Sequence, residues 1–492
     1  MYSLLRRAPR SVPTLARGFA AVPAAVAEQD VFTRLASPYP APIDVSASLA
    51  SLPAAKVTTL PSGLRVATES VPFSSTATVG VWIDAGSRYE TAQTSGAAHF
   101  LEHMFFKGTG RRSQKDLELE VEDMGGHLNA YTSREQTAYY AKVRGRDVPR
   151  AVDLLADMLQ NSKLEASTIE RERDVILREA QEIEGVPYEV ALDHLHATAF
   201  QGSPLSRTIL GPAESVKALS RDDLAAYIAR NYAAPRVVVA AAGDVDHDDL
   251  VKLAGEAFAA LPAEGPSAAA LAAAEPSTFV GSEVRLRDPD LGALHWTLAY
   301  RGAAWTDKDA VALQVLQALL GSWDAAGSAG ADAASPLAPL VAANGLATSF
   351  SAFNTNYADT GLFGLYATAE AGDDAPHDDL AYAVMDSITG LAYRIDDDDA
   401  QRAKNAALAA LLFAADGTTG LAEELGRGLL VYGRHVPRAE LAARINALTA
   451  ADLRGAAKRF FVDQPIASAA LGDTQFLPDY NWLARRTYFL RY

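Results

Sequence analysis

The 492-residue chain is built from two similar halves, and this internal repeat constrains its fold more than any other feature. Each half contains a strand-like run that ends in glycine and is followed by a helical segment, at residues 78–86 and 294–302. Near the end of each half the same residues recur at identical spacings: Asp223, Leu224, Arg230, Gly243 and Asp244 correspond to Asp452, Leu453, Arg459, Gly472 and Asp473. A repeat of this length predicts two tandem homologous domains rather than a solenoid of short units.

The order of patterns within each half indicates the fold class. Strand-like runs follow one another and helical runs follow one another, which predicts α+β layers rather than a doubly wound parallel sheet. We expect a first domain at residues 45–261, a partly helical linker at 262–280, and a second domain at 281–492. Residues 321–345 are rich in Ala, Gly and Ser, and we expect them to form a mobile loop, to which no function is assigned.

One short motif carries the most definite chemistry. His99 and His103 stand four residues apart, with Glu102 directly before the second histidine. On a helix these three side chains share a face, so both imidazoles can bind one metal ion while the carboxylate activates a water. The order H-x-x-E-H is typical of inverzincins. Buried structural histidines are the alternative, but only this pair among nine histidines has the helical i, i+4 spacing, which favours a metal site.

A zinc site built on two histidines needs a third protein ligand. The chain has no cysteine, so this ligand must be His, Asp or Glu. The best candidates lie in the helical, Glu-rich run at residues 170–182, where Glu172 and Glu179 are two turns apart on one face. A solvated charged helix is the alternative for such a run. The residues alone leave Glu172, Glu179 and Glu182 open as the third ligand.

The second half lacks the motif. An ungapped alignment of the halves at Gly86 and Gly302 places Val315 opposite His99, Ala318 opposite Glu102 and Leu319 opposite His103. All three residues are apolar, so only the first half can bind a metal ion in this way.

The motif and the Glu-rich helix that follows it together resemble the pitrilysin/insulinase-type zinc peptidases. The resemblance runs from about residue 55 to the C-terminus and includes three further segments, at residues 125–132, 207–212 and 485–492. It implies that each domain is an antiparallel sheet packed by helices, and that one zinc ion is bound by His99, His103 and Glu179. It also implies that Glu102 is the catalytic base and that Glu172 supports catalysis by orienting a ligand.

Within this family the chain is most similar to the beta subunits of mitochondrial processing peptidases. The resemblance implies a zinc metalloendopeptidase that removes presequences from imported precursor proteins, with a noncatalytic alpha-type subunit as its partner. The same resemblance covers core protein 1 of respiratory complex III (ubiquinol-cytochrome c reductase). A structural subunit with little or no peptidase activity is therefore the alternative, and one polypeptide can also hold both roles. An insulinase-type peptide scavenger is a third hypothesis, although such proteins are usually longer.

An acidic pair is a candidate for substrate recognition. Glu189 and Asp193 are one helical turn apart, and two carboxylates so placed repel each other unless a cation lies between them. They match beta-subunit residues that read the arginine near the cut, so we expect them to bind a substrate guanidinium. An exposed acidic helix face is the alternative.

The resemblance supplies the other substrate-binding positions. Asn129, Ala130 and Tyr131 are expected on an edge strand that accepts the extended peptide by β-addition. Phe106 is expected to line the pocket for the residue after the cut, with plain core packing as the alternative. Tyr357 is expected to face the active cavity from the second half.

Residues 1–27 differ from the rest of the chain, because they contain four arginines and no acidic residue. This composition is typical of a mitochondrial transit peptide, and a cut after Phe19 is expected; a disordered basic tail is the alternative. We therefore expect the protein in the mitochondrial matrix or on the matrix face of the inner membrane. No apolar run reaches the roughly 18–20 residues that span a bilayer, which makes it peripheral at most. Its net charge of −17 argues against nucleic acid as a partner.

Overall fold

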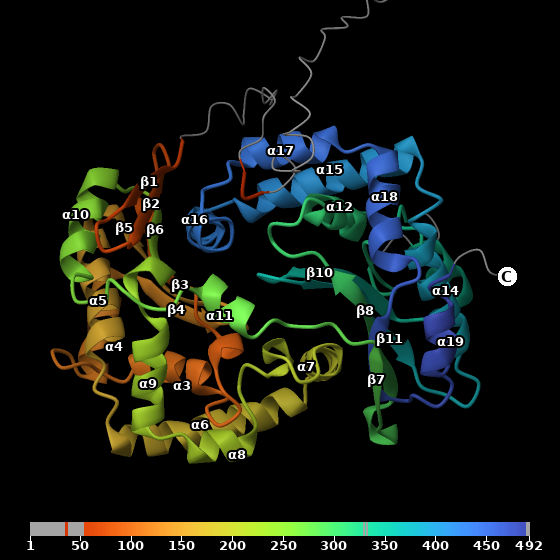
Figure 1. The fold of residues 1–492 in the computed structure, drawn as a ribbon, viewed down its shortest axis with the longest axis horizontal. Coiled ribbons are helices and arrows are strands. Elements are labelled where there is room, and N and C mark those ends of the chain that lie inside the picture. The colour runs from red at the N-terminus through yellow and green to blue at the C-terminus, as the bar shows by residue number, and fades with distance from the viewer. Residues whose placement is uncertain (1–34, 38–53, 328–329, 331–332, 489–492) are drawn as a thin grey trace, which may run out of the picture.

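The computed structural model describes residues 35–37, 54–327, 330 and 333–488, and the expected transit segment at 1–27 with Phe19 lies outside them. Two lobes follow one another along the chain, and each is built on one six-stranded sheet with helices beside it (Figure 1). This arrangement confirms the predicted α+β fold with two tandem domains of the same architecture.

The two sheets share a core of five strands with the same topology. In spatial order the strands of the first sheet are β1 (Lys56–Thr59), β2 (Arg65–Ser70), β6 (Val237–Gly243), β3 (Thr76–Ile83), β5 (Thr137–Arg144) and β4 (His127–Thr132). Those of the second sheet are β7 (Ser282–Arg287), β12 (Ile466–Gly472), β8 (Ala293–Gly302), β11 (Gly361–Glu370), β10 (Ser349–Asn356) and β9 (Ser322–Asp324). Each sheet is antiparallel apart from one parallel pair, β2 with β6 and β7 with β12. The parallel pair joins the same two strands of this shared core, as the sequence repeat predicts. The sixth strand lies at opposite edges, with β1 beside β2 in the first sheet and β9 beside β10 in the second.

Helices fill the connections between these strands. Those of the first half and the linker are α3 (Ala97–Phe105), α4 (Gln114–Met124), α5 (Val148–Asn161), α6 (Ala166–Glu184), α7 (Pro187–Ala199), α8 (Ala213–Ala218), α9 (Arg221–Asn231), α10 (His247–Ala257) and α11 (Ala268–Ala274). Those of the second half are α12 (Ala310–Leu320), α13 (Ala338–Asn344), α14 (His377–Gly390), α15 (Asp397–Ala414), α16 (Thr418–Tyr432), α17 (Arg438–Ala447), α18 (Ala450–Phe461) and α19 (Tyr480–Arg485). None of the helices in the described ranges has the length and apolar character needed to cross a bilayer.

Within residues 321–345, part of the described chain has regular structure in place of the loop that the composition predicts. It contains the short strand β9, which pairs with β10, and the helix α13. Leu337, Ala338 and Val341 are buried in the core of the second half. Small and apolar side chains here pack against that core, so the expectation of a loop is wrong over these elements.

Each half places one of its helices on the sheet of the other half. Strand β6 alternates its side chains between two cores, with Val237 and Val239 facing the helices of the first half and Val238 facing α16 of the second half. On α16, Leu421, Leu425 and Leu429 form that second core. A Cβ on Gly426 would overlap the indole of Trp82, so glycine is required where α16 crosses the first sheet.

Helix α7 makes the reciprocal contact. Leu195 and Ala199 of this helix pack with Ala299, Leu362 and Ala467, which lie on strands of the second sheet. In Figure 1, α7 accordingly lies beside the second lobe and α16 beside the first. The exchange joins the halves through two buried apolar cores, and α6 and α7, although adjacent in sequence, belong to different lobes.

An ion-pair cluster around the buried Arg88 and Glu135 also joins the halves. The Arg88 guanidinium donates to both carboxylate oxygens of Asp359, at 2.8 and 2.6 Å, and to Glu135 at 2.6 Å. Glu135 also accepts the backbone N–H of Ala358. Arg88 and Glu135 lie in the first half and Asp359 in the second, so the turn between β10 and β11 is held against the turn between β4 and β5.

Candidate metal centre

Helix α3 carries the histidine motif, and its first turn is fixed from outside the helix. The carboxylate of the buried Glu90 accepts the N–H groups of Gly96 and Ala98, both at 2.8 Å. These donors belong to the first turn, which has no helical acceptor for them. Gly96 has φ +93°, and a Cβ there would overlap the carbonyl oxygen of Leu210, so the N-cap requires glycine. Burial raises the pKa of Glu90 to about 8, against the lowering effect of the two N–H groups.

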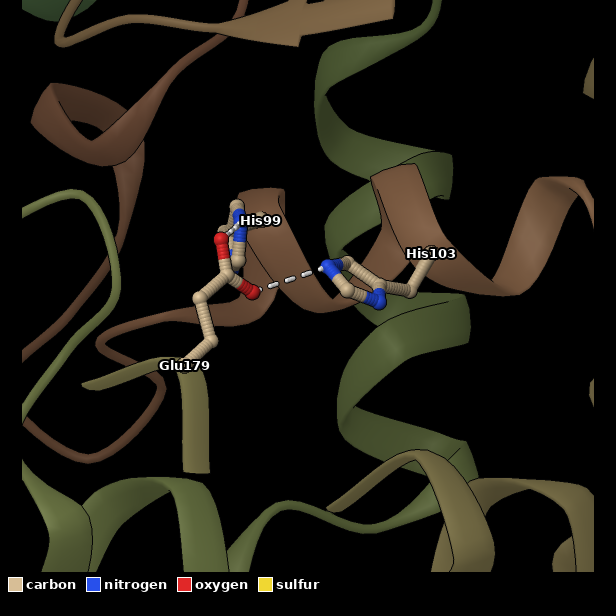
Figure 2. Close-up of side chains that lie close together, drawn as sticks. All are labelled: His99, His103 and Glu179. Carbon is tan, nitrogen blue, oxygen red and sulfur yellow. Dashed lines mark ion pairs between the residues drawn. The ribbon is translucent and has the colours of Figure 1, made fainter. Parts of the chain in front are cut away.

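Three of the predicted side chains converge on one point. Nε2 of His99 lies 3.6 Å from Oε1 of Glu179, and Nε2 of His103 lies 3.3 Å from Oε2 of the same carboxylate. One ligand atom from each residue can be chosen so that all lie within 4.8 Å of one another. Figure 2 shows the Glu179 carboxylate between the two imidazoles, which come from the neighbouring turns of α3. Of the three glutamates left open by the sequence, Glu179 is the one that contacts both histidines.

Glu172 lies on the other side of His103. Its Oε2 is 3.4 Å from Nδ1 of His103, and its Oε1 is 2.9 Å from Nζ of Lys107. The glutamate is buried, whereas Glu182, on the last turn of α6, is exposed. Burial lowers the pKa of His103, but contacts with Glu179 and Glu172 outweigh it and raise that pKa overall. Contacts with His103 and His99 hold the pKa of Glu179 below its ordinary range.

The candidate catalytic base is tied to the edge strand. The hydroxyl of Thr132, the last residue of β4, donates to Oε2 of Glu102 at 2.6 Å. Strand β4 lies at the edge of the first sheet, as expected, and pairs with β5. Asn129, Ala130 and Tyr131 lie on this strand, so the Glu102 carboxylate is fixed relative to the backbone that they present.

The expected substrate residues occupy different environments. Phe106 packs partly buried against the core of the first half, with its ring 6.4 Å from that of Tyr139. Tyr131 donates to Glu423 of α16 at 2.8 Å. Tyr357 is buried, and its hydroxyl lies 2.7 Å from Nε2 of His196 on α7.

One member of the acidic pair on α7 is paired with an arginine of the same chain. Nη2 of Arg134 donates to Oδ1 of Asp193 at 2.6 Å, whereas Glu189 is exposed and takes part in no ion pair within the described part of the chain. Lys107, Thr132 and Arg134 were not among the predicted site residues. Thr132 directly follows the predicted edge-strand residues and could have been included with them. Arg134 lies 59 residues before its partner, and no spacing pattern links the two.

The donor set fits a zinc ion. Two imidazole nitrogens and one carboxylate oxygen are a ligand set that zinc binds in catalytic sites, where a fourth position is left for water or substrate. The Nε2 atoms of both histidines face Glu179, and the contact of Glu172 with Nδ1 of His103 is the kind of outer contact that metal-binding histidines make. At the matching place in the second half, Val315 and Leu319 of α12 are buried in its apolar core.

Comparison with known proteins identifies the family and the relatives of this chain. A family model described as "Insulinase (Peptidase family M16)" matches residues 65–213, and one described as "Peptidase M16 inactive domain" matches residues 218–407. The chain is 54% identical over 464 residues to an Arabidopsis thaliana protein named "Probable mitochondrial-processing peptidase subunit beta, mitochondrial", covering 94% of this chain and 86% of that protein. It is 47% identical to the mitochondrial-processing peptidase beta subunit of Rattus norvegicus, covering 88% of this chain and 87% of that one.

The fold has also been seen in a solved structure. A chain in a structure titled "Complex III2 from Candida albicans, Inz-5 bound" superposes with a TM-score of 0.79 at 24% identity, covering 88% of this chain and all of that one. At this identity the likeness concerns the fold. The family models and the relatives establish that the chain belongs to the insulinase family, peptidase family M16.

Proposed function

We propose that this chain is the catalytic beta-type subunit of a mitochondrial processing peptidase, a zinc metalloendopeptidase that removes presequences from imported precursor proteins. The observation that carries the proposal is the convergence of His99, His103 and Glu179, with Glu102 on the same helix as the histidines. The names of the relatives, which share about half of their residues with this chain, support the substrate class.

The zinc ion would be held by His99, His103 and Glu179. When bound, zinc would polarise the scissile carbonyl and lower the pKa of the attacking water. Glu102 accepts the proton of that water at a carboxylate oxygen and passes it to the leaving amine. The Thr132 hydroxyl donates to Oε2 of Glu102, so Oε1 is the oxygen left for the water. Glu172 holds the ring of His103, and Lys107 compensates the buried charge of Glu172.

The peptide would lie along the edge strand. The open edge of β4 offers backbone groups of Asn129, Ala130 and Tyr131 for β-addition, and Thr132 connects this strand to the base. Phe106, partly exposed, would contact the residue after the cut. The acidic pair on α7 would take the substrate arginine, and Tyr357 would support α7 from the second half.

The partner and location follow from the same resemblance. We propose a noncatalytic alpha-type subunit as the partner and presequence peptides as substrates. The mitochondrial location agrees with the names of the relatives, and the finer position is the matrix or the matrix face of the inner membrane. A structural core subunit of complex III is the second candidate. The fold likeness to a complex III chain favours it, and the retained metal-site residues favour the peptidase.

The native assembly tests both candidates. Isolated from mitochondria through a tag on this chain, it is expected to contain zinc and to cleave a presequence peptide at one bond. Chelation should abolish cleavage and added zinc should restore it. Cleavage without cytochrome subunits in the same assembly would exclude the scaffold, and cleavage with them would show both roles. Cytochromes with neither zinc nor cleavage would refute the peptidase.

A further inference from the structure

One carboxylate of the acidic pair that is expected to bind a substrate arginine is already paired with an arginine of the chain itself. Arg134 lies in the turn between β4 and β5, and its side chain is only 10% exposed. Its Nη2 donates to Oδ1 of Asp193 at 2.6 Å. Its Nε is buried and has no hydrogen-bond partner among the described residues. The guanidinium is thus held at Asp193 in the free chain.

A second set of contacts fixes α7 beside this guanidinium. Nδ1 of His196 lies 2.7 Å from the carbonyl oxygen of Leu192, which can only accept, so Nδ1 carries the imidazole proton. Nε2 is then an acceptor, and the Tyr357 hydroxyl donates to it at 2.7 Å. Burial, followed by the charge of Arg134, holds the pKa of His196 well below its ordinary value, which agrees with a neutral ring. Tyr357 therefore presents its oxygen lone pairs, not its proton, to the positive charge of Arg134.

Arg134 makes the net charge around the acidic pair less negative than that of the two carboxylates alone. Glu189 and Asp193 together carry two negative charges, but Arg134 compensates one of them. Asp193 keeps its second oxygen, Oδ2, and Glu189 is exposed. The subsite thus offers two carboxylates to an incoming guanidinium, but it has only one uncompensated negative charge, which a single cation neutralises.

We propose that Arg134 is a specificity-determining residue that sets the charge of the arginine subsite. This inference rests on the proposed peptidase function. With Arg134 in place, one substrate guanidinium neutralises the subsite. Without it, the two carboxylates attract any cation more strongly. Without Asp193, the positive charge of Arg134 faces the substrate cation uncompensated and repels it.

The proposal predicts an unusual double-mutant cycle. Asp193→Asn should raise the KM of a peptide with arginine near the cut by about tenfold or more, because it leaves Arg134 unpaired. Arg134→Met should lower that KM by about threefold to tenfold at low salt, and reduce the preference for arginine over lysine at the same position. The double variant, which retains Glu189 and removes the repelling charge, should return the KM to within about threefold of the wild type.

The experiment uses the full chain assembled with its alpha-type partner. Steady-state KM and kcat are measured for matched arginine and lysine peptides with the wild type, Arg134→Met, Asp193→Asn and the double variant. Arg459→Met is the matched control, because Arg459 forms an Arg–Asp pair with Asp307 on the second half. Arg134→Lys, which keeps the charge, should remain near the wild-type KM and gives a second test if the methionine variant does not fold.

Three outcomes would overturn the proposal. The first is a double variant as impaired as Asp193→Asn, which would mean that Asp193 acts only by direct contact. The second is a higher KM in Arg134→Met for both peptides alike, which would mean that Arg134 only supports the structure. The third is unchanged binding of the peptides to Arg134→Met, measured by fluorescence anisotropy on a Glu102→Gln background. Absence of cleavage by the wild type would instead refute the proposed function, and the anisotropy measurement would still test Arg134.

Discussion

Glu172 contacts Nδ1 of His103, so that the two nitrogens of this imidazole face two different carboxylates. Oε2 of Glu172 lies 3.4 Å from Nδ1, while Nε2 of the same ring lies 3.3 Å from Glu179. Because the carboxylate accepts the proton at Nδ1, Nε2 is left with its lone pair for a metal ion. The Lys107 ammonium lies 2.9 Å from the other oxygen of Glu172 and holds this buried carboxylate in place.

Replacing Glu172 should therefore weaken metal binding without removing a ligand. We expect Glu172→Gln to lower the zinc affinity by about 10- to 100-fold, the range found when outer contacts of metal-binding histidines are removed. Competition with a coloured chelator measures the affinity. Glu170→Gln is the matched control, because Glu170 is an exposed glutamate on the same helix that pairs with Arg173. Equal zinc affinities of the wild type and Glu172→Gln would contradict this role.

Glu102 should be dispensable for the metal and essential for cleavage. We expect Glu102→Gln to retain one zinc ion per chain, since Glu102 lies outside the ligand cluster, and to lose cleavage by about 100-fold or more because the amide cannot accept a proton. Zinc content by elemental analysis and single-turnover cleavage are measured on the same sample. Wild-type turnover would exclude Glu102 as the base. Loss of zinc would show that it acts through the metal site instead.

Much of this site could be read from the sequence, because its parts are local. The spacing of His99, Glu102 and His103 requires only that residues 97–105 form a helix, and the two-turn spacing of Glu172 and Glu179 requires only that residues 166–184 do. Which glutamate meets the histidines depends on how α6 crosses α3. Periodicity does not encode that crossing, and the choice of Glu179 came from the family resemblance.

The long-range pairs could not be predicted in this way. A helical pattern shows that one face of α16 is apolar, but not that this face lies on the sheet of the other half. The bond between Arg134 and Asp193 spans 59 residues, and that between Arg88 and Asp359 spans 271. Both depend on turns whose relative position is set by the docking of the two halves. The repeat predicted two similar domains but not the exchange of α7 and α16.

The exchanged helix α16 should contribute strongly to stability. Leu425 is fully buried against the first sheet, so we expect Leu425→Ala to destabilise the protein by about 2–5 kcal/mol through lost burial and a cavity. The apparent melting temperature should fall, and limited proteolysis should cut between the halves sooner. Leu412→Ala on α15 is the control, because Leu412 is 46% exposed. If both variants have the melting temperature of the wild type, the packing of α16 on the first sheet adds little stability.

Glu90, which caps the first turn of α3, should make the stability of the metal-binding helix depend on pH. Burial raises its pKa from 4.5 to about 8, so between these values the folded protein keeps a proton that the unfolded chain has lost. The resulting stabilisation is complete below the unfolded pKa and is lost as the pH rises through about 8, at roughly 1.4 kcal/mol per pH unit.

Glu90→Gln removes this titration, because the amide stays neutral at every pH, and it also removes one of the two acceptors for the N–H groups of Gly96 and Ala98. We expect the variant to melt below the wild type at about pH 6, by the equivalent of roughly 1 kcal/mol or more, and the gap to shrink by about pH 9. Scanning fluorimetry with saturating zinc gives both melting temperatures. Glu122→Gln, on the exposed face of α4, is the control and should follow the wild type at both pH values. A gap that is the same at both would mean that Glu90 is ionised throughout and caps α3 as a charged group.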